Sequence, residues 1–115
     1  MTIHFYGITN CDTVKKARAW LDAKGLDYEF HDFKKEGADH DRVRSWVQAV
    51  GWETLLNRKG TTFRQLDPAQ KEDLDSEKAI RLMVAKPTTI KRPVVECEDG
   101  VLVGFDTEKW EAELG

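Results

Sequence analysis

The stretch Ile3–Ala17 reads IHFYGITNCDTVKKA and contains a cysteine where one residue pattern changes into another. More and less polar residues alternate over residues 2–6, which is typical of a short strand, and the next four residues predict a loop. From Val14 onward, apolar residues recur at helical spacing, and Lys24-Gly25 predicts the end of that helix. Cys11 therefore stands at a predicted helix start, where backbone N–H groups and the helix dipole favour a thiolate, the form that attacks electrophiles.

A second strand is predicted over residues 26–33, soon after the helix. A strand, a helix and a strand in this order favour two parallel strands joined by a right-handed crossover. Towards the other end of the chain, residues 94–98 and 101–103 flank Asp99-Gly100, which is a strong hairpin signal. This hairpin is predicted to place Cys97 opposite Leu102. Together these segments predict a mixed four-stranded sheet.

The middle of the chain, residues 38–86, carries only helical patterns. One apolar stripe ends at Gly51, and Pro87 stops the last stripe. Between them, Asp67-Pro68 followed by Gln70 is typical of a capped helix start. These residues therefore predict an all-helical insertion.

A final helix is predicted after Asp106, with Phe105 and Trp110 spaced as a hydrophobic staple across its start. Helices that cover a mixed four-stranded sheet define an α/β fold class, and this order of elements is typical of a thioredoxin-like fold with an all-helical insertion at about residues 38–86. We expect residues 1–115 to form one domain.

The composition argues against several classes of function. The 115 residues include 18 basic and 21 acidic side chains, a net charge of −3, and this mixture offers no basic field for direct binding of nucleic acid. No apolar run reaches the length of a membrane span, and the first residues do not read as a secretory signal. We therefore expect a cytoplasmic protein that binds neither nucleic acid nor membranes.

The residues that could hold a metal ion are scattered in the sequence. His4, His31 and His40 are far apart, and the separation of Cys11 from Cys97 fits no zinc-ligand spacing. We interpret the histidines as strand or surface residues and predict no metal and no bound cofactor. Cys97 lies in an alternating strand and is interpreted as a small packed side chain, with a resolving role towards Cys11 as the alternative.

Three separated motifs occur in a recognisable order: Asn10-Cys11-Asp12-Thr13 at the helix start, LLNRKG at Leu55–Gly60, and IKRPVV at Ile90–Val95. In this combination the chain resembles the arsenate reductase (ArsC) family, nearest its YffB and Spx branches, from about residue 3 to about residue 112. The resemblance implies a thioredoxin-like fold with a redox-active cysteine.

The resemblance also implies roles for individual residues. Cys11 would be the nucleophile, Arg58 and Arg92 would bind an anionic substrate or glutathione with help from Asn10, and Pro93 would follow a cis peptide bond. A guanidinium suits such a role because its planar fork can donate two parallel hydrogen bonds to an oxyanion or a carboxylate.

The function implied by the resemblance is that of a glutathione-dependent thiol reductase, a thiol-disulfide oxidoreductase that acts on a small thiol, a disulfide or an oxyanion. Glutathione would be the co-substrate, because a site with one active thiol needs an external thiol to release it from its covalent intermediate.

Two alternatives stay open. One is an Spx-like regulator or adaptor that binds RNA polymerase without catalysis. The other is an arsenate reductase proper. Spx regulators carry a Cys-x-x-Cys switch, whereas this chain has Cys11-Asp12-Thr13-Val14. Arsenate reductases of the family carry a further arginine, which is missing from residues 101–106 here.

Overall fold

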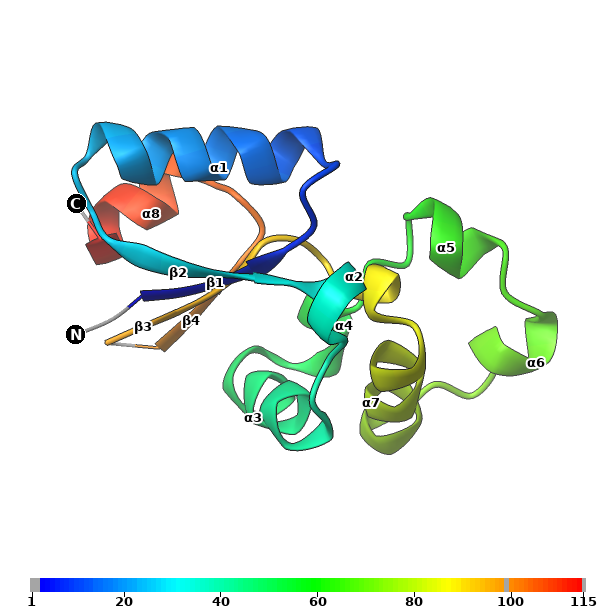
Figure 1. Ribbon diagram of the computed structural model, residues 1–115. Coiled ribbons are helices and arrows are strands. Elements are labelled where there is room, and N and C mark those ends of the chain that lie inside the picture. The colour runs from blue at the N-terminus through cyan, green and yellow to red at the C-terminus, as the bar shows by residue number, and fades with distance from the viewer. Residues whose placement is uncertain (1–2, 99, 115) are drawn as a thin grey trace. The chain divides into compact units, whose positions relative to one another are not determined.

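The computed structural model describes residues 3–98 and 100–114, which form two compact units (Figure 1). The first unit combines the two ends of the chain, up to Phe33 and from Arg92 onward, and the second is the continuous stretch Lys34–Lys91. The organisation as one domain stays a prediction.

The first unit is built on a four-stranded sheet in the order β2-β1-β3-β4. The strands are β1 (Ile3–Gly7), β2 (Tyr28–Asp32), β3 (Val94–Cys97) and β4 (Gly100–Val103). β1 runs parallel to β2 and antiparallel to β3, and β3 is antiparallel to β4. The mixed four-stranded sheet predicted from the sequence is therefore confirmed.

Helices α1 (Asp12–Ala23) and α8 (Thr107–Leu114) lie on the same side of this sheet (Figure 1). Their apolar faces join Phe5 of β1 in one buried cluster, because alternate residues of a strand point to the same face. The members of this cluster are Phe5, Val14, Ala17, Leu21, Val95, Leu102 and Trp110.

The predicted cap of the last helix is present. The side chain of Asp106 accepts a hydrogen bond from the backbone N–H of Glu108 at 3.1 Å, and the rings of Phe105 and Trp110 meet edge to face with centroids 4.9 Å apart. The cap and the hydrophobic staple together fix the start of α8.

Some predicted boundaries were wrong. β2 begins at Tyr28, two residues later than predicted, and ends at Asp32, because Phe33 begins the short helix α2 (Phe33–Glu36). Residue 2, which was included in the first strand, lies outside the described residues and stays a prediction. In the hairpin, Cys97 pairs with Gly100 and not with Leu102 as predicted. Asp99, in the predicted turn, lies outside the described residues. A shift of two residues keeps every side chain on its face, which is why the alternation could not reveal it.

The second unit is helical, as predicted for residues 38–86. It contains α3 (His40–Val50), α4 (Trp52–Leu55), α5 (Thr61–Arg64), α6 (Pro68–Lys71), α7 (Ser76–Ala85) and the 3-10 helix η1 (Pro87–Thr89). Gly51 ends α3 with a φ of 87°, a conformation that favours glycine. The backbone N–H of Asp67 donates to the Gln70 side chain at 3.1 Å, as expected at the start of α6.

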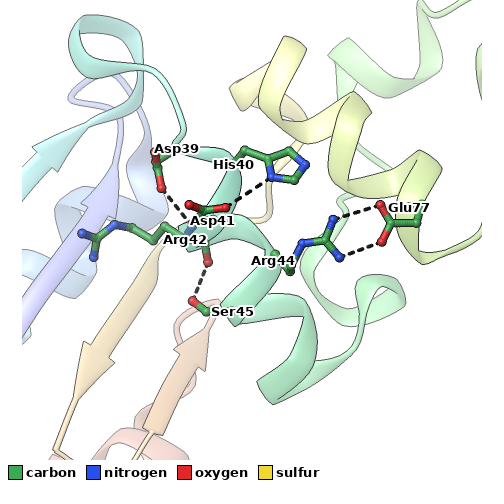
Figure 2. A network of polar contacts seen from close by, with 7 residues as sticks. All are labelled: Asp39, His40, Asp41, Arg42, Arg44, Ser45 and Glu77. Atoms are coloured by element: carbon green, nitrogen blue, oxygen red, sulfur yellow. Dashed lines mark hydrogen bonds and ion pairs between the residues drawn. The ribbon is translucent and has the colours of Figure 1, made fainter.

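The two longest helices of this unit, α3 and α7, contact one another. Each contributes a buried apolar stripe, with Val43 and Trp46 on α3 and Ile80 and Met83 on α7. At the surface, the guanidinium of Arg44 donates two hydrogen bonds, of 2.7 and 3.0 Å, to the carboxylate of Glu77 (Figure 2).

Candidate active site

Cys11 is the N-cap residue of α1. Its backbone is extended, with φ −149° and ψ 122°, and its carbonyl accepts the first helical hydrogen bond from the N–H of Lys15 at 3.0 Å. Among the described residues, the Cys11 side chain receives no capping hydrogen bond. The thiol is half-buried and packs on the apolar cluster under α1. It therefore lies beside the positive end of a twelve-residue helix without acting as its cap.

The approach of β1 to α1 depends on Gly7. A Cβ atom at this position would lie 2.9 Å from Cγ2 of Val14, a fully buried side chain in the first turn of α1. Ile8, the next residue, is also buried, whereas Asn10, directly before the cysteine, is exposed. The tight contact of strand end and helix start thus determines where the backbone of Cys11 lies.

The Arg92–Pro93 segment belongs to the same unit as Cys11. Its peptide bond is cis, as the family resemblance implies. Pro93 is buried, and its carbonyl accepts a hydrogen bond from the N–H of Gly104 at 2.8 Å. Arg92 is half-buried, with its Nε atom shielded from solvent. The structure therefore anchors this arginine at the entrance to β3.

Arg58 belongs to the second unit, where it lines a pocket of about 290 Å³. Its guanidinium lies over the ring of Trp52, 5.6 Å from the centroid. The residues lining the pocket are Glu53, Thr54, Leu56, Asn57, Arg58, Lys59 and Lys91. Three cations and one carboxylate give this pocket a net positive charge, which suits a carboxylate or an oxyanion.

Two backbone hydrogen bonds join the segments that form the pocket. The N–H of Asn57 donates to the carbonyl of Thr89 at 2.8 Å, and the N–H of Lys91 donates to the carbonyl of Leu55 at 2.7 Å. These bonds bring Lys91 to the same pocket as Arg58. Lys59 and Lys91 were not among the residues predicted for the site, yet both line this pocket. Their positions inside the LLNRKG and IKRPVV motifs were the available signal.

The candidate residues are thus divided between the units. Asn10, Cys11, Arg92 and Pro93 belong to the first unit, and Arg58 belongs to the second. The joint binding of one anion by both arginines stays a prediction.

Cys97 is half-buried near the end of β3, on the same apolar cluster as Cys11. Its thiol donates to the carbonyl of Gly100 at 3.4 Å. Both cysteines are thiols in the structure. The small packed side chain expected at position 97 fits this environment, and a resolving role for it stays a prediction.

Within the described part of the chain, no helix combines the length and the apolar character that crossing a membrane requires.

Comparison with known proteins gives one consistent result. The model of the ArsC family matches residues 6–113. A solved structure described as YFFB protein is 54% identical, with a TM-score of 0.97 over 99% of this chain and 100% of that one. An uncharacterized protein of Haemophilus influenzae is 37% identical over 110 residues, 96% of either chain. The global transcriptional regulator Spx of Lactiplantibacillus plantarum is 23% identical over 106 residues, 90% of this chain and 80% of Spx.

Proposed function

The chain belongs to the ArsC family, and from this premise we propose that it is a glutathione-dependent thiol-disulfide oxidoreductase with Cys11 as its nucleophile. The observation that carries the proposal is the position of Cys11, which is partly exposed at the start of α1 and whose side chain is not used as a cap. A helix N-terminus favours the thiolate over the thiol, and only the thiolate attacks a disulfide.

The reaction proceeds in two exchanges. The Cys11 thiolate attacks the glutathione sulfur of a mixed disulfide, so a bond forms between Cys11 and glutathione while the substrate leaves as a thiolate and takes up a proton. A second glutathione thiolate then attacks the glutathione sulfur bound to Cys11. Oxidised glutathione leaves and the Cys11 thiolate returns. In the net reaction one free glutathione thiol and the mixed disulfide give the substrate thiol and oxidised glutathione.

In this scheme the task of the cationic and polar groups is to bind glutathione, which carries two carboxylates. Arg92, anchored before cis Pro93, and the exposed amide of Asn10 are the groups of the first unit that we assign to it. The pocket of Arg58, Lys59 and Lys91 lies in the second unit, and its positive charge by itself suits an anionic group. We expect Arg92→Ala to weaken glutathione binding, and an unchanged affinity would remove Arg92 from the site.

A second candidate function is that of an adaptor that binds RNA polymerase, which the likeness to Spx supports over 90% of this chain. The Cys-x-x-Cys switch of Spx has no counterpart here, because Val14 holds the position of its second cysteine and is fully buried in the core. An adaptor of this kind would act without that switch. Recovery of RNA polymerase subunits with the purified protein, at equal yield with Cys11→Ser, would favour the adaptor over the enzyme.

Arsenate reduction is the third candidate. The further arginine of arsenate reductases is missing from residues 101–106, which form β4 and the turn before α8. We therefore expect turnover of a glutathione mixed disulfide to exceed turnover of arsenate.

Steady-state turnover of a glutathione mixed disulfide tests the enzymatic proposal. We expect Cys11→Ser to abolish turnover, because a hydroxyl at this position stays protonated and does not exchange with disulfides. The matched control is Cys97→Ser, which removes the other half-buried thiol and should leave turnover largely intact. Full activity of the Cys11→Ser variant would refute the assignment.

A further inference from the structure

Two histidines and a glutamate that are scattered in the sequence lie together on the sheet of the first unit. In the parallel pairing of β1 and β2, His4 is opposite Glu29, and Tyr6 is opposite His31. Side chains of a strand alternate between faces, so these residues lie on the face opposite to Phe5 and the cluster under α1 and α8. The pairing register, and not sequence proximity, brings the three side chains together.

Two of the three distances between their polar atoms are close to the edges of a metal coordination shell. Nδ1 of His4 is 3.0 Å from Nε2 of His31 and 3.2 Å from Oε2 of Glu29, and the three ligand atoms all lie within 4.8 Å of one another. In a tetrahedral zinc site, bonds of about 2.0 to 2.2 Å separate neighbouring ligand atoms by about 3.3 to 3.6 Å. The Glu29 side chain is 62% exposed and can turn to shorten the longest of the three separations.

Protons alone satisfy this arrangement poorly. A neutral imidazole nitrogen carries either one N–H or one lone pair, yet Nδ1 of His4 faces both a second imidazole nitrogen and a carboxylate oxygen. If His31 donates its proton to Nδ1, the Nδ1 lone pair is also turned towards the Glu29 carboxylate. If Nδ1 carries the proton, His31 and Glu29 compete for it. A cation among the three groups accepts a lone pair from each of them.

The surroundings orient the ligands. The Tyr6 ring stacks on His31 with centroids 4.6 Å apart and an interplanar angle of 15°, and its hydroxyl donates to the Glu96 side chain at 3.2 Å. Stacking of this kind limits rotation of the His31 ring and keeps Nε2 directed at His4. Groups that hold metal-binding histidines in place typically change metal affinity by 10 to 100 fold.

From this geometry we propose that His4, Glu29 and His31 form a binding site for a divalent transition-metal ion, with Zn²⁺ as the ion that fits the ligands best. Two imidazoles and one carboxylate are a known ligand set of zinc sites, whereas Mg²⁺ and Ca²⁺ prefer oxygen ligands. Three protein ligands leave a further position for water or a small anion. The site goes beyond the proposed thiol chemistry, because it uses neither cysteine.

Zinc titration of the full chain, followed through the imidazole nitrogen signals in NMR spectra, tests the proposal residue by residue. We expect one equivalent of Zn²⁺ to shift the signals of His4 and His31 and to leave those of His40 in place. His40 is a matched control, because its Nδ1 also lies near a carboxylate, 3.7 Å from Oδ1 of Asp41 (Figure 2).

Competition with a chelator then gives the affinity of each variant. Glu29→Gln changes an exposed side chain and keeps its shape, so this variant should fold, and we expect it to bind Zn²⁺ at least about tenfold more weakly. Cys11→Ser and His40→Gln should bind as the parent protein does. Absent binding, an affinity unchanged by Glu29→Gln, or zinc binding lost on Cys11→Ser alone would each overturn the proposal.

Discussion

The two units of this protein are stabilised in different ways. In the first, β1 (Ile3–Gly7) pairs with β2 and with β3, so residues from both ends of the chain meet in one sheet and one buried cluster. In the second, every element comes from the continuous stretch Lys34–Lys91, and α4, α5 and α6 have four residues each. Helices this short are unstable on their own and depend on caps and on packing against neighbours. The comparison indicates a sheet unit that depends on pairing between distant parts of the chain and a helical unit that depends on packing between elements of one continuous stretch.

The largest expected effect comes from removing the central tryptophan of the sheet unit. Trp110 is 1% exposed, meets the rings of Phe5, Trp20 and Phe105, and donates from Nε1 to the carbonyl of Gly104 at 3.1 Å. We expect Trp110→Ala to lower the free energy of unfolding by about 3 to 5 kcal/mol, measured by denaturant titration.

The matched variant in the helical unit is Trp46→Ala, since Trp46 is also 1% exposed. If the units unfold together, as expected for one domain, both variants shift the same single transition. Two separate transitions, each moved by only one of the variants, would contradict the single-domain prediction.

A smaller effect is expected where β1 meets α1. Gly7→Ala would place a Cβ 2.9 Å from a buried methyl of Val14, and relief of this contact requires a shift in the core. We expect a loss of about 1 to 3 kcal/mol in unfolding free energy. Gly60→Ala is the counterpart in the helical unit, where the new Cβ meets the end of the Asn57 side chain at 2.8 Å. That amide can move away, so equal losses for the two variants would contradict the distinction between a fixed buried neighbour and a movable one.

Much of the fold could be predicted from local signals. Some features depend only on residues that are close together in the sequence, and these were predicted. They are the apolar stripes of α1, α3 and α7, the glycine at position 51 and the cap at Asp106. The short helices α2 and α5 could not be predicted, because one turn is too short to show a helical period.

The candidate site was predictable only in part. Cys11 at the start of α1 follows from the residue pattern, and the cis bond at Pro93 follows from the family resemblance. The cluster of His4, Glu29 and His31 was missed, because it exists only through the register in which β1 pairs with β2. The pocket that Arg58 shares with Lys91 was missed for a similar reason, since backbone hydrogen bonds across a long sequence separation create it.

One helix cap in each unit allows the loss of stability to be compared for the same type of contact. Asp106 caps α8 in the sheet unit, and Asp39 caps α3 by accepting from the N–H of Arg42 at 3.0 Å (Figure 2). Each substitution by alanine removes one side-chain acceptor from a helix start, and we expect each to lower the unfolding free energy by about 1 kcal/mol. Hydrogen exchange of the amides in the first turn of each helix locates the loss. An increase in exchange elsewhere but not in the capped turn would contradict this interpretation.

The smallest effect is expected at the ion pair between α3 and α7. The hydrogen bonds from Arg44 hold the pKa of Glu77 below its ordinary value of 4.5. A carboxyl group with a lowered pKa in the folded state contributes stability above its ordinary value, and this contribution is lost as the pH falls through the lowered pKa. Both side chains are partly exposed, so the contribution is small and weakens with added salt.

Thermal unfolding of Glu77→Gln across pH checks this. We expect a slightly lower Tm than the parent at neutral pH and a difference that shrinks as the pH falls below 4.5. A difference that persists unchanged in acid would show that the pair does not act through charge.

The most direct test of the central claim, that Cys11 is the reactive thiol, is the mass of the intact protein after incubation with oxidised glutathione, followed by peptide mapping. We predict one glutathione adduct, located on Cys11, formed equally in the Cys97→Ser variant and released by reduced glutathione. An adduct on Cys97 alone, or none under conditions that modify a model thiol, would contradict the account.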